Sequence, residues 1–460
     1  MSDLRDNTGG GRRAPAFLQR MFRSLRTRNY RLWFFGQTVS QCGTWMQSVA
    51  QYWLVLELTH SAFDLGITAA LQFAPVLFFG TIGGLVADRF DKRKVLLVTQ
   101  TAFTVQATVL WALVASGSVR LWMVWALALT YGFINVADNP SRQSFVVEMA
   151  GPDDLTNAVG LNSVIVNVSR IIGPAVAGVM IATVGLSWAF LANAISFGAV
   201  IGALYAMRAS ELHRRPPLAR AKGQIRAGLR YAWRAWELRV PLIMMAVIGT
   251  LAYNFSVILP LFAHDIFHRG AGTYSALTVA MGIGALAGGL AIASRQRPSH
   301  KLLVAVSLAF GVFILGVAAA PSLPLCLALL VLMGAASIMF IATANSLLQL
   351  NSSGAMRGRV MALWAVVFLG STPIGAPLIG FIAGRYGARF ALGLGGVATV
   401  LVAIWAGLAL RRIRDTRRLA AEDAAPPAAA ALTVAADCLA TDGNVREGGL
   451  RRTLEPAGES

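Results

Sequence analysis

Charged residues are scarce in this sequence. Only 13% of its 460 residues are Asp, Glu, Lys or Arg, and 56% are hydrophobic. Because a soluble domain carries about 25% charged residues, we expect most of this chain's surface to face lipid. Cysteine and histidine are also scarce: Cys42, Cys326 and Cys438 are too far apart for a disulfide framework or a metal-binding spacing, and the five histidines lie in or near predicted loops. We therefore expect no metal site and no cofactor.

Acidic residues are outnumbered, 21 against 40 Lys and Arg, which gives a net charge of +19. In a soluble protein such an excess would suggest nucleic-acid binding. Here the basic residues lie between apolar runs and not on one face, so we interpret them as determinants of membrane orientation and expect no nucleic-acid partner. The first 29 residues are rich in arginine and lack the apolar core of a signal peptide.

Twelve apolar runs are long enough to cross the hydrocarbon core of a bilayer, which takes about 20 residues. They predict an all-α membrane protein with spans at residues 30–57, 62–87, 95–115, 121–141, 157–184, 187–206, 240–263, 272–294, 302–320, 323–349, 358–385 and 388–410. Basic residues crowd the N-terminal arm, the loop after the second span, the central linker and the region after the last span. Since basic loops stay in the cytoplasm, we expect a multi-pass inner-membrane protein with both termini cytoplasmic.

The spans divide the chain into five parts. They are a cytoplasmic basic arm (1–29), a six-helix half (30–206), a cytoplasmic linker (207–239), a second six-helix half (240–410) and a disordered cytoplasmic tail (411–460). Within the linker, apolar residues recur at helical spacing opposite arginines over residues 224–237. This pattern predicts an amphipathic helix on the anionic inner leaflet, with a docking site for a partner protein as the alternative. The apolar positions are Ile225, Leu229, Ala232 and Trp236, and the basic ones are Arg226, Arg230 and Arg234.

The two halves repeat one another. Residues 172–178 (IGPAVAG) in the fifth span correspond to residues 374–380 (IGAPLIG) in the eleventh, with Gly185 and Gly387 at the same offset. Further matches pair Asn139 and Gln143 with Asn345 and Gln349, and Gly83-Gly84-Leu85 with Gly288-Gly289-Leu290. Parallel repeats of this kind predict a substrate site at the interface of the halves, near the middle of the membrane.

The loop between the second and third spans carries the strongest motif, GGLVADRFDKRK over residues 83–94. It resembles the inner-loop motif of the major facilitator superfamily, although Asp91 stands where that family usually has glycine. The resemblance implies two parallel-related six-helix halves and a conformational lock, in which Asp88 accepts hydrogen bonds from a helix N-terminus of the other half and holds the outward-open state. The positions that match the motif are Gly84, Asp88, Arg89, Arg93 and Lys94.

The fifth span resembles the exporter motif of the same superfamily, with Ser and Ala in place of two of its glycines. That motif implies close packing of the fifth and eighth helices and antiport rather than uptake, although patterns of small residues occur in many membrane bundles. Its positions here are Gly160, Ser169, Gly173, Pro174, Ala177 and Gly178.

Three further stretches resemble the branch of the superfamily that contains the enterobactin exporter and drug-resistance pumps. They are residues 29–33 (NYRLW), 53–59 (WLVLELT) and 138–146 (DNPSRQSFV), and the similarity extends over about residues 25–412. The resemblance implies outward transport of drugs, siderophores or secondary metabolites, driven by protons. A lipophilic cation dye is one cargo that we expect on this basis.

Polar residues inside the spans are candidates for the substrate cavity. Five recur every three or four residues in the first span and form one stripe, which faces either the cavity or neighbouring helices because facing lipid would be costly. Arg170 is the only arginine well inside a span, with Asn167 on the same side of its helix. We expect Arg170 to hold an anionic group of the substrate or to make a structural ion pair. The stripe consists of Gln37, Gln41, Thr44, Ser48 and Gln51.

Asp138 and Arg142 are spaced to pair across one turn of the fourth span, close to its predicted inner end. A stable pair favours the charged carboxylate, which disfavours permanent proton carriage. A gating pair is therefore the preferred interpretation, with transient protonation of Asp138 during transport as the alternative.

These observations predict a secondary active transporter, a proton-coupled exporter whose partners are a small-molecule substrate, protons and the lipid bilayer. A same-fold importer and a non-transporting membrane sensor or scaffold are the alternatives. The exporter motif disfavours the first, and the inner-loop motif disfavours the second. An intramembrane enzyme is not expected, because neither a metal cluster nor a nucleophile–base pair is evident in the sequence.

Overall fold

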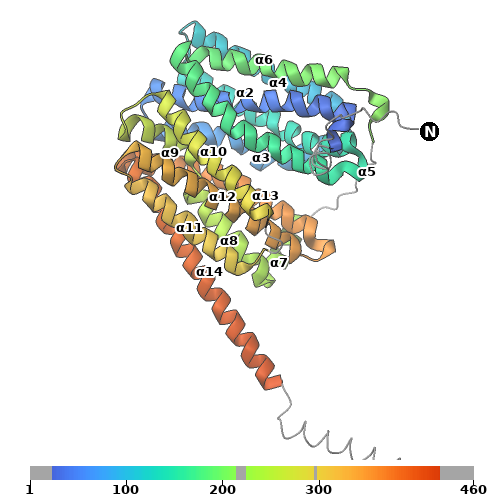
Figure 1. Cartoon of the computed structure of the whole chain (residues 1–460), viewed down its shortest axis with the longest axis vertical. Coiled ribbons are helices and arrows are strands. Elements are labelled where there is room, and N and C mark those ends of the chain that lie inside the picture. The colour runs from blue at the N-terminus through green and yellow to red at the C-terminus, as the bar shows by residue number, and fades with distance from the viewer. Residues whose placement is uncertain (1–22, 214–223, 295–297, 425–460) are drawn as a thin grey trace, which may run out of the picture. The chain divides into compact units, whose positions relative to one another are not determined.

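The computed structural model describes residues 23–213, 224–294 and 298–424. In these ranges every regular element is a helix (Figure 1). The chain divides into two compact units, Met1–Ile404 and Trp405–Ser460, and the helix bundle described below belongs to the first. Most of the predicted basic arm and of the predicted tail lies outside the described residues.

The first half of the bundle contains five long helices and a short one. They are η1 (Arg23–Arg26), α2 (Arg28–Thr59), α3 (Ala62–Arg89), α4 (Lys92–Ala115), α5 (Leu121–Thr183) and α6 (Leu186–Ala206). Within α5, Gly151 has φ 72° and ψ 174°, so α5 comprises two helices that meet at a kink. These are the spans Leu121–Gly151 and Asp154–Thr183.

The second half follows a linker that holds η2 (Ala209–Glu211) and α7 (Gln224–Arg234). Its elements are α8 (Trp236–Leu251), α9 (Phe255–Leu261), η3 (Phe262–Ile266), α10 (Ala271–Ala293), α11 (His300–Ala319), α12 (Leu323–Leu350), α13 (Gly354–Tyr386) and α14 (Ala388–Ala424). Between the halves, α3 packs along α13 and α5 packs along α10.

Eleven helical segments of the described residues are long and apolar enough to cross a membrane. Helix α2 is not among them, although it has 32 residues. The cause is its glutamines, of which Gln37, Gln47 and Gln51 are only 3% exposed. Because the bundle shelters these amides from lipid, α2 serves as the twelfth span, and the predicted all-α membrane fold is confirmed.

The internal repeat has a physical basis in the packing of glycines. A Cβ added to Gly83 of α3 would collide with the carbonyl oxygen of Val136 in α5. At the corresponding place in the second half, a Cβ on Gly288 of α10 would collide with the carbonyl oxygen of Ala335 in α12. Both glycines therefore permit the same close approach of helix backbones.

The repeat also extends to side-chain hydrogen bonds. Gln143 donates from Nε2 to Oδ1 of Asn139 over 3.0 Å, and Gln349 donates from Nε2 to Oδ1 of Asn345 over 3.1 Å. The same bond at corresponding positions of α5 and α12 supports the prediction that the two halves are related as parallel repeats.

Two turns correspond as well. Gly185 before α6 has φ 101°, and Gly387 before α14 has φ 89°. Side chains with a Cβ rarely adopt such angles, so glycine is favoured at both turns. The chain accordingly reverses between two spans at each place, as the sequence predicts.

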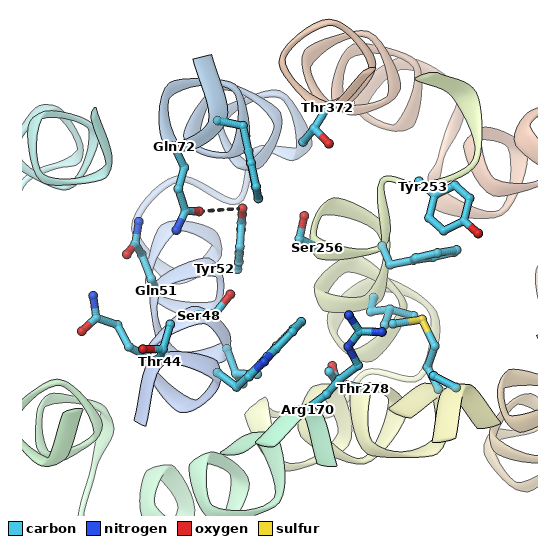
Figure 2. A pocket seen from close by; sticks show the side chains of 18 of the residues that line it. Thr44, Ser48, Gln51, Tyr52, Gln72, Arg170, Tyr253, Ser256, Thr278 and Thr372 are labelled. Carbon is cyan, nitrogen blue, oxygen red and sulfur yellow. Dashed lines mark hydrogen bonds between the residues drawn. The ribbon is translucent and has the colours of Figure 1, made fainter. Parts of the chain in front are cut away.

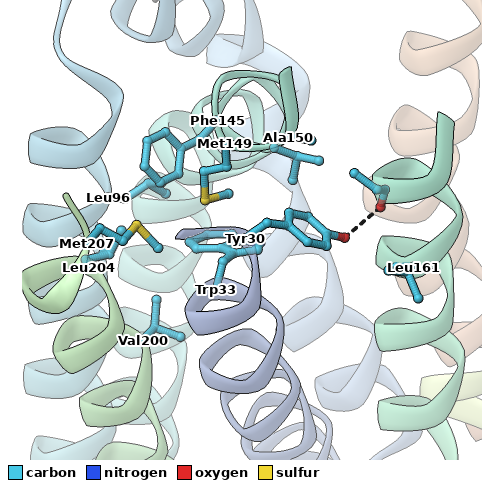
Figure 3. Packing of buried hydrophobic residues seen from close by; sticks show 12 residues of the cluster. Tyr30, Trp33, Leu96, Phe145, Met149, Ala150, Leu161, Val200, Leu204 and Met207 are labelled. Atoms are coloured by element: carbon cyan, nitrogen blue, oxygen red, sulfur yellow. Dashed lines mark hydrogen bonds between the residues drawn. The ribbon is translucent and has the colours of Figure 1, made fainter. Parts of the chain in front are cut away.

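An aromatic cluster holds the start of α2 against α4, α5 and α6 (Figure 3). Tyr30 donates a hydrogen bond from Oη to the carbonyl oxygen of Ala158 over 2.8 Å, and the rings of Trp33 and Phe145 meet edge to face, 5.7 Å apart. Both Tyr30 and Trp33 are fully buried. Much of the 29–33 stretch, which carries the family resemblance, therefore contributes to the core of the first half.

Two predicted spans differ from the structure. The fourth span continues beyond 141 to Gly151, whereas the last predicted span, 388–410, agrees with Ala388–Arg412, although helix α14 itself runs on to Ala424. The seventh span is broken at residues 252–254, between α8 and α9, where the sequence predicts one helix over 240–263. Apolar content alone locates a span, but the ends of its helix depend on tertiary contacts.

The linker helix is shorter than predicted, because Trp236 begins α8 and does not belong to α7. Ala232 is fully buried, whereas Leu229 is 44% exposed and Trp233 is 53% exposed. Helix α7 packs against α13, and the backbone N–H of Ser353 donates to Tyr231 Oη over 3.2 Å. Of the predicted apolar face, Ala232 is therefore buried against the protein, whereas Leu229 is exposed. The side chains of residues 225 and 226 lie outside the described residues.

Candidate functional site

A cavity of about 410 Å³ lies between the two halves. Helices α2, α3 and α5 line it from the first half, and α9, α10, α12 and α13 line it from the second. Figure 2 shows that α2 and α9 present polar and aromatic side chains to each other across this space. The cavity is where the internal repeat predicts a substrate site.

The predicted polar stripe of α2 is only partly in the cavity. Thr44, Ser48 and Gln51 line it, whereas Gln37 and Gln41 do not. Gln41 accepts a hydrogen bond at Oε1 from Nη1 of Arg142 over 3.2 Å. The stripe therefore has two environments: its second half faces the cavity, and Gln41 connects α2 with α5.

Asn167 is also outside the cavity lining. Its Nδ2 donates to the carbonyl oxygen of Ser163 in its own helix over 2.8 Å. Arg170, three residues further on, does line the cavity. Its guanidinium lies over the ring of Trp45, 5.1 Å from the centroid. Its Nε is buried and has no hydrogen-bond partner among the described residues.

The break between α8 and α9 places a second group of side chains in the cavity. Tyr253, Phe255 and Ser256 all line it. Tyr253 donates from Oη to the carbonyl oxygen of Ser337 in α12 over 2.9 Å, and Asn254 Nδ2 donates to the carbonyl oxygen of Thr250 over 2.8 Å. Interrupted helices at a substrate site are common in secondary transporters. The sequence signal for this break is weak: Thr250, Asn254 and Ser256 interrupt a largely apolar run.

Several cavity residues of the first half are absent from the predicted set. Tyr52 donates from Oη to Oε1 of Gln72 over 3.2 Å, which joins α2 to α3 within the lining. Gln47 accepts at Oε1 from Nδ2 of Asn193 over 2.7 Å and donates from Nε2 to Oε1 of Gln106 over 3.2 Å. Gln47 lies three residues after Thr44 and four before Gln51, so it fits the same spacing although the predicted stripe does not include it.

Asp138 and Arg142 form the predicted pair, with 3.5 Å between Arg142 Nε and Asp138 Oδ2. Asp138 is 2% exposed, and its Oδ1 accepts from Thr99 Oγ1 over 2.8 Å and from Gln100 Nε2 over 2.9 Å. Since the helix runs on to Gly151, the carboxylate lies about 20 Å before its end, at 1.5 Å per residue. The expectation that the pair lies near the inner surface of the membrane stays a prediction.

The inner-loop motif surrounds the turn between α3 and α4. Gly84 is buried, Asp88 lies half-buried in the last turn of α3, and Arg89 and Lys94 are exposed. Arg93 donates from Nε to the carbonyl oxygen of Leu204 over 2.8 Å and from Nη2 to that of Tyr205 over 3.3 Å, so it stabilises the end of α6 within the same half.

Asp91, where the family usually has glycine, is the N-cap of α4. Its Oδ1 accepts from the backbone N–H of Lys94 over 3.2 Å. Lys92 forms a 2.7 Å ion pair with Glu148, which the sequence does not identify because the partners lie 56 positions apart.

The exporter-motif residues divide between two neighbours. A Cβ on Gly173 would lie 2.5 Å from the carbonyl oxygen of Cys42 in α2, and Ser169 Oγ accepts from Cys42 Sγ over 3.5 Å. A Cβ on Gly178 would lie 2.7 Å from Ser275 Cβ in α10. Among the described residues, nothing lies within 4 Å of a Cβ on Gly160. Pro174 and Ala177 are buried.

Helix α5 packs along α10, as the exporter motif implies for the fifth and eighth helices, but only part of the motif lies at that interface. In this structure Gly178 serves that packing, whereas Gly173 and Ser169 face the first helix. The eleventh helix repeats the arrangement, because a Cβ on Gly375 would collide with the carbonyl oxygen of Thr250 in α8.

The halves also meet beyond the cavity, at the end of the bundle where α2 turns into α3. The rings of Trp53 and Tyr274 stack with centroids 6.4 Å apart, and those of His60 and His264 lie 5.5 Å apart. These contacts join α2 to α10 and η3 at that end of the bundle. No group of three or more His, Cys, Asp or Glu that could hold a metal ion lies in the part of the chain that the structure describes.

Comparison with known proteins agrees with this geometry. Residues 20–439 match the family described as transmembrane secretion effector. The staphyloferrin A transporter of Staphylococcus aureus is 23% identical over 78% of this chain and 91% of its own length. The multidrug efflux pump Tap of Mycobacterium tuberculosis is 28% identical over 80% of this chain and 91% of its own length. The enterobactin exporter EntS of Citrobacter koseri is 26% identical over 85% of this chain and 93% of its own length.

Solved structures show the same fold at low sequence identity. The nucleoside transporter NupG superposes with a TM-score of 0.66 at 13% identity, over 83% of this chain and 98% of its own. A bacterial homologue of the human lysosomal transporter Spinster superposes with a TM-score of 0.64 at 12% identity, over 84% and 95%. The chain therefore belongs to the transmembrane secretion effector family of major facilitator transporters, as a multi-pass protein of the inner membrane.

Proposed function

We propose that this protein exports amphipathic organic molecules from the cytoplasm in exchange for protons. The observation that carries the proposal is the cavity between the halves, whose lining combines aromatic rings with neutral hydrogen-bonding groups. Such a lining suits a molecule with both an apolar body and polar substituents. The names of the relatives support the direction, since they include an efflux pump and a siderophore exporter.

The proposed orientation of the protein in the membrane rests on the distribution of Lys and Arg among its loops. The turn at residues 89–94 has four Lys and Arg residues and the linker is also basic. The turns at the opposite ends of the spans have fewer: none flanks Gly185, and Arg385 and Arg389 flank Gly387. Basic loops stay cytoplasmic, so the end at which Trp53 stacks on Tyr274 is the outer end in this proposal. Because the halves meet at that end, we propose that this state receives cargo from the cytoplasm.

Asp138 is our candidate for the proton carrier. Its carboxylate is buried, and Arg142 is the only cation that contacts it among the described residues. When the halves rearrange and Arg142 moves away, an unpaired buried carboxylate is costly and a proton removes that cost. Arg142 also contacts Gln41 of α2, so a movement of α2 is coupled to the pair. In the same scheme Asp88 stabilises the alternate, outward-open state.

The experiment uses cells that lack their own efflux pumps. Cells that express the protein are loaded with a macrolide, a catecholate siderophore or an aromatic dye, and retention is followed with and without a protonophore. We expect faster loss of at least one cargo, and we expect the protonophore to abolish the difference. Faster entry of all three cargoes contradicts the outward direction, and efflux that survives the protonophore contradicts proton coupling.

A further inference from the structure

We infer that the cavity selects its cargo by charge: it binds aromatic molecules that carry an anionic group, which Arg170 holds, and it disfavours cations. The inference rests on the proposed export function and names the class of cargo. It reverses one expectation from the sequence, that a lipophilic cation dye is a suitable cargo.

The first argument is the charge of the lining. Among the described residues that line the cavity, Arg170 is the only one with a formal charge. The nearby carboxylates are occupied elsewhere: Asp138 is hydrogen-bonded to Thr99 and Gln100 behind the lining, and Glu57 accepts from Trp53 Nε1 over 2.6 Å. A cation in the cavity therefore finds no carboxylate to offset its loss of water and meets the positive charge of Arg170.

The second argument is the state of Arg170 itself. Arg170 is half-buried, and a guanidinium in such a position ordinarily pairs with a carboxylate or several acceptors. Among the described residues, Arg170 instead contacts the face of the Trp45 ring. Its Nε is buried without a hydrogen-bond partner. In Figure 2 the Arg170 side chain extends from α5 toward α9. A carboxylate or phenolate there would accept two parallel N–H bonds from the guanidinium.

The third argument is the shape of the surrounding groups. Aromatic rings line the cavity that Arg170 enters from both halves: Trp45 from the first, and Tyr253 and Phe255 from the second. Aromatic rings favour stacked or edge-to-face contact with another ring. A flat aromatic acid can therefore place its ring between these side chains while its anionic group reaches Arg170. Neutral donors and acceptors, including Ser48 of α2, complete the lining.

The test uses three molecules that share one naphthalene ring: a carboxylate, its methyl ester and the corresponding primary amine. Their export is measured in energised membrane vesicles that contain the wild type or a variant. We expect the carboxylate to be exported at least about tenfold faster than the amine. Arg170→Gln is expected to lower carboxylate export at least about tenfold and ester export less than about twofold, while Arg170→Lys retains part of the carboxylate rate because it keeps the charge.

Arg385→Gln is the matched control, because it removes an exposed arginine that does not line the cavity, and we expect it to behave like the wild type. Export of the amine at the rate of the carboxylate overturns the inference and leaves the export function intact. Equilibrium binding of the three molecules to purified protein provides the second readout. Binding of the carboxylate by the wild type and not by Arg170→Gln, without any export, supports the cargo class and contradicts the export function. No binding of the carboxylate overturns the inference.

Discussion

At the scale of single residues, Asp138 is a carboxylate that is only 2% exposed and that pairs with Arg142. Asp138→Asn keeps the size of the side chain and removes the charge that Arg142 requires, so Arg142 is left without its carboxylate. We expect export to fall at least about tenfold, which corresponds to about 1.4 kcal/mol, while protein abundance in the membrane stays near normal.

The control for Asp138→Asn is Thr99→Ser, which retains the hydroxyl that donates to Asp138 Oδ1. Export rate per unit of protein is the measurement for both variants. Unchanged export by Asp138→Asn would remove Asp138 from the proton pathway and leave it a structural residue.

Gly83 offers a second test at this scale, because it allows α3 to approach the backbone of α5 at Val136. Gly83→Ala places a methyl group against a carbonyl oxygen that belongs to a helix backbone and cannot move freely. Overpacking of this kind costs about 1–3 kcal/mol, and we expect lower abundance and a lower melting temperature of the purified protein.

Gly80→Ala is the matched control for Gly83→Ala, one helical turn away in the same helix. Nothing among the described residues lies within 4 Å of a Cβ at Gly80, so its substitution is expected to leave abundance and melting temperature unchanged. Equal stability of the two variants would show that the close approach of α3 and α5 is not required.

At the scale of helices, two aspartates near the turn between α3 and α4 are expected to have different roles: Asp91 caps α4, and Asp88 is proposed to act in transport. Asp91 caps α4 through the backbone N–H of Lys94, and replacing a capping Asp by glycine costs only a few tenths of a kcal/mol. We expect Asp91→Gly to export normally. We expect Asp88→Asn to lower export at least about tenfold, because it weakens the outward-open state that the inner-loop motif is proposed to stabilise.

Abundance and export rate, measured for both variants in the same membranes, distinguish the two roles. The opposite outcome, normal export by Asp88→Asn and impaired export by Asp91→Gly, would mean that this loop acts through helix capping alone.

Helix positions and the repeat could be predicted from the sequence, because apolar length and the recurrence of glycines are local signals. About half of the cavity, the lining contributed by the second six-helix half, could not be predicted from the sequence. Thr44, Ser48 and Arg170 are conspicuous because polar residues are costly in lipid. Tyr253, which lines the cavity at the break between α8 and α9, resembles a ring that faces lipid until the neighbouring helices are in place. The distance of Asp138 from the end of its helix could not be predicted either, because nothing in the sequence shows that the helix continues to Gly151.

At the scale of the whole molecule, the sign of the cargo's charge affects the energetics of transport. An anion that leaves the cytoplasm while a proton enters transfers two elementary charges in the same electrical sense. Each charge contributes about 2.3 kcal/mol per 100 mV of membrane potential. We therefore expect export of an aromatic carboxylate to respond more strongly to membrane potential than export of its neutral ester.

A potassium diffusion potential in vesicles without a pH gradient measures this difference. Carboxylate export that rises with an inside-negative potential in the cellular orientation, together with a weaker response of the ester, supports exchange of an anion for a proton. Equal responses of the two molecules would indicate that the carboxylate travels in a neutral form.

The most direct test of proton-driven export uses inverted membrane vesicles, whose interior corresponds to the outside of the cell. An acidic interior is imposed, and accumulation of the aromatic carboxylate is measured for the wild type and for Asp138→Asn. We expect the wild type to accumulate the carboxylate against its concentration gradient, a protonophore to release it, and Asp138→Asn to accumulate little. Loss of preloaded carboxylate from acidic vesicles, or accumulation that is the same with and without the pH gradient, would contradict the account.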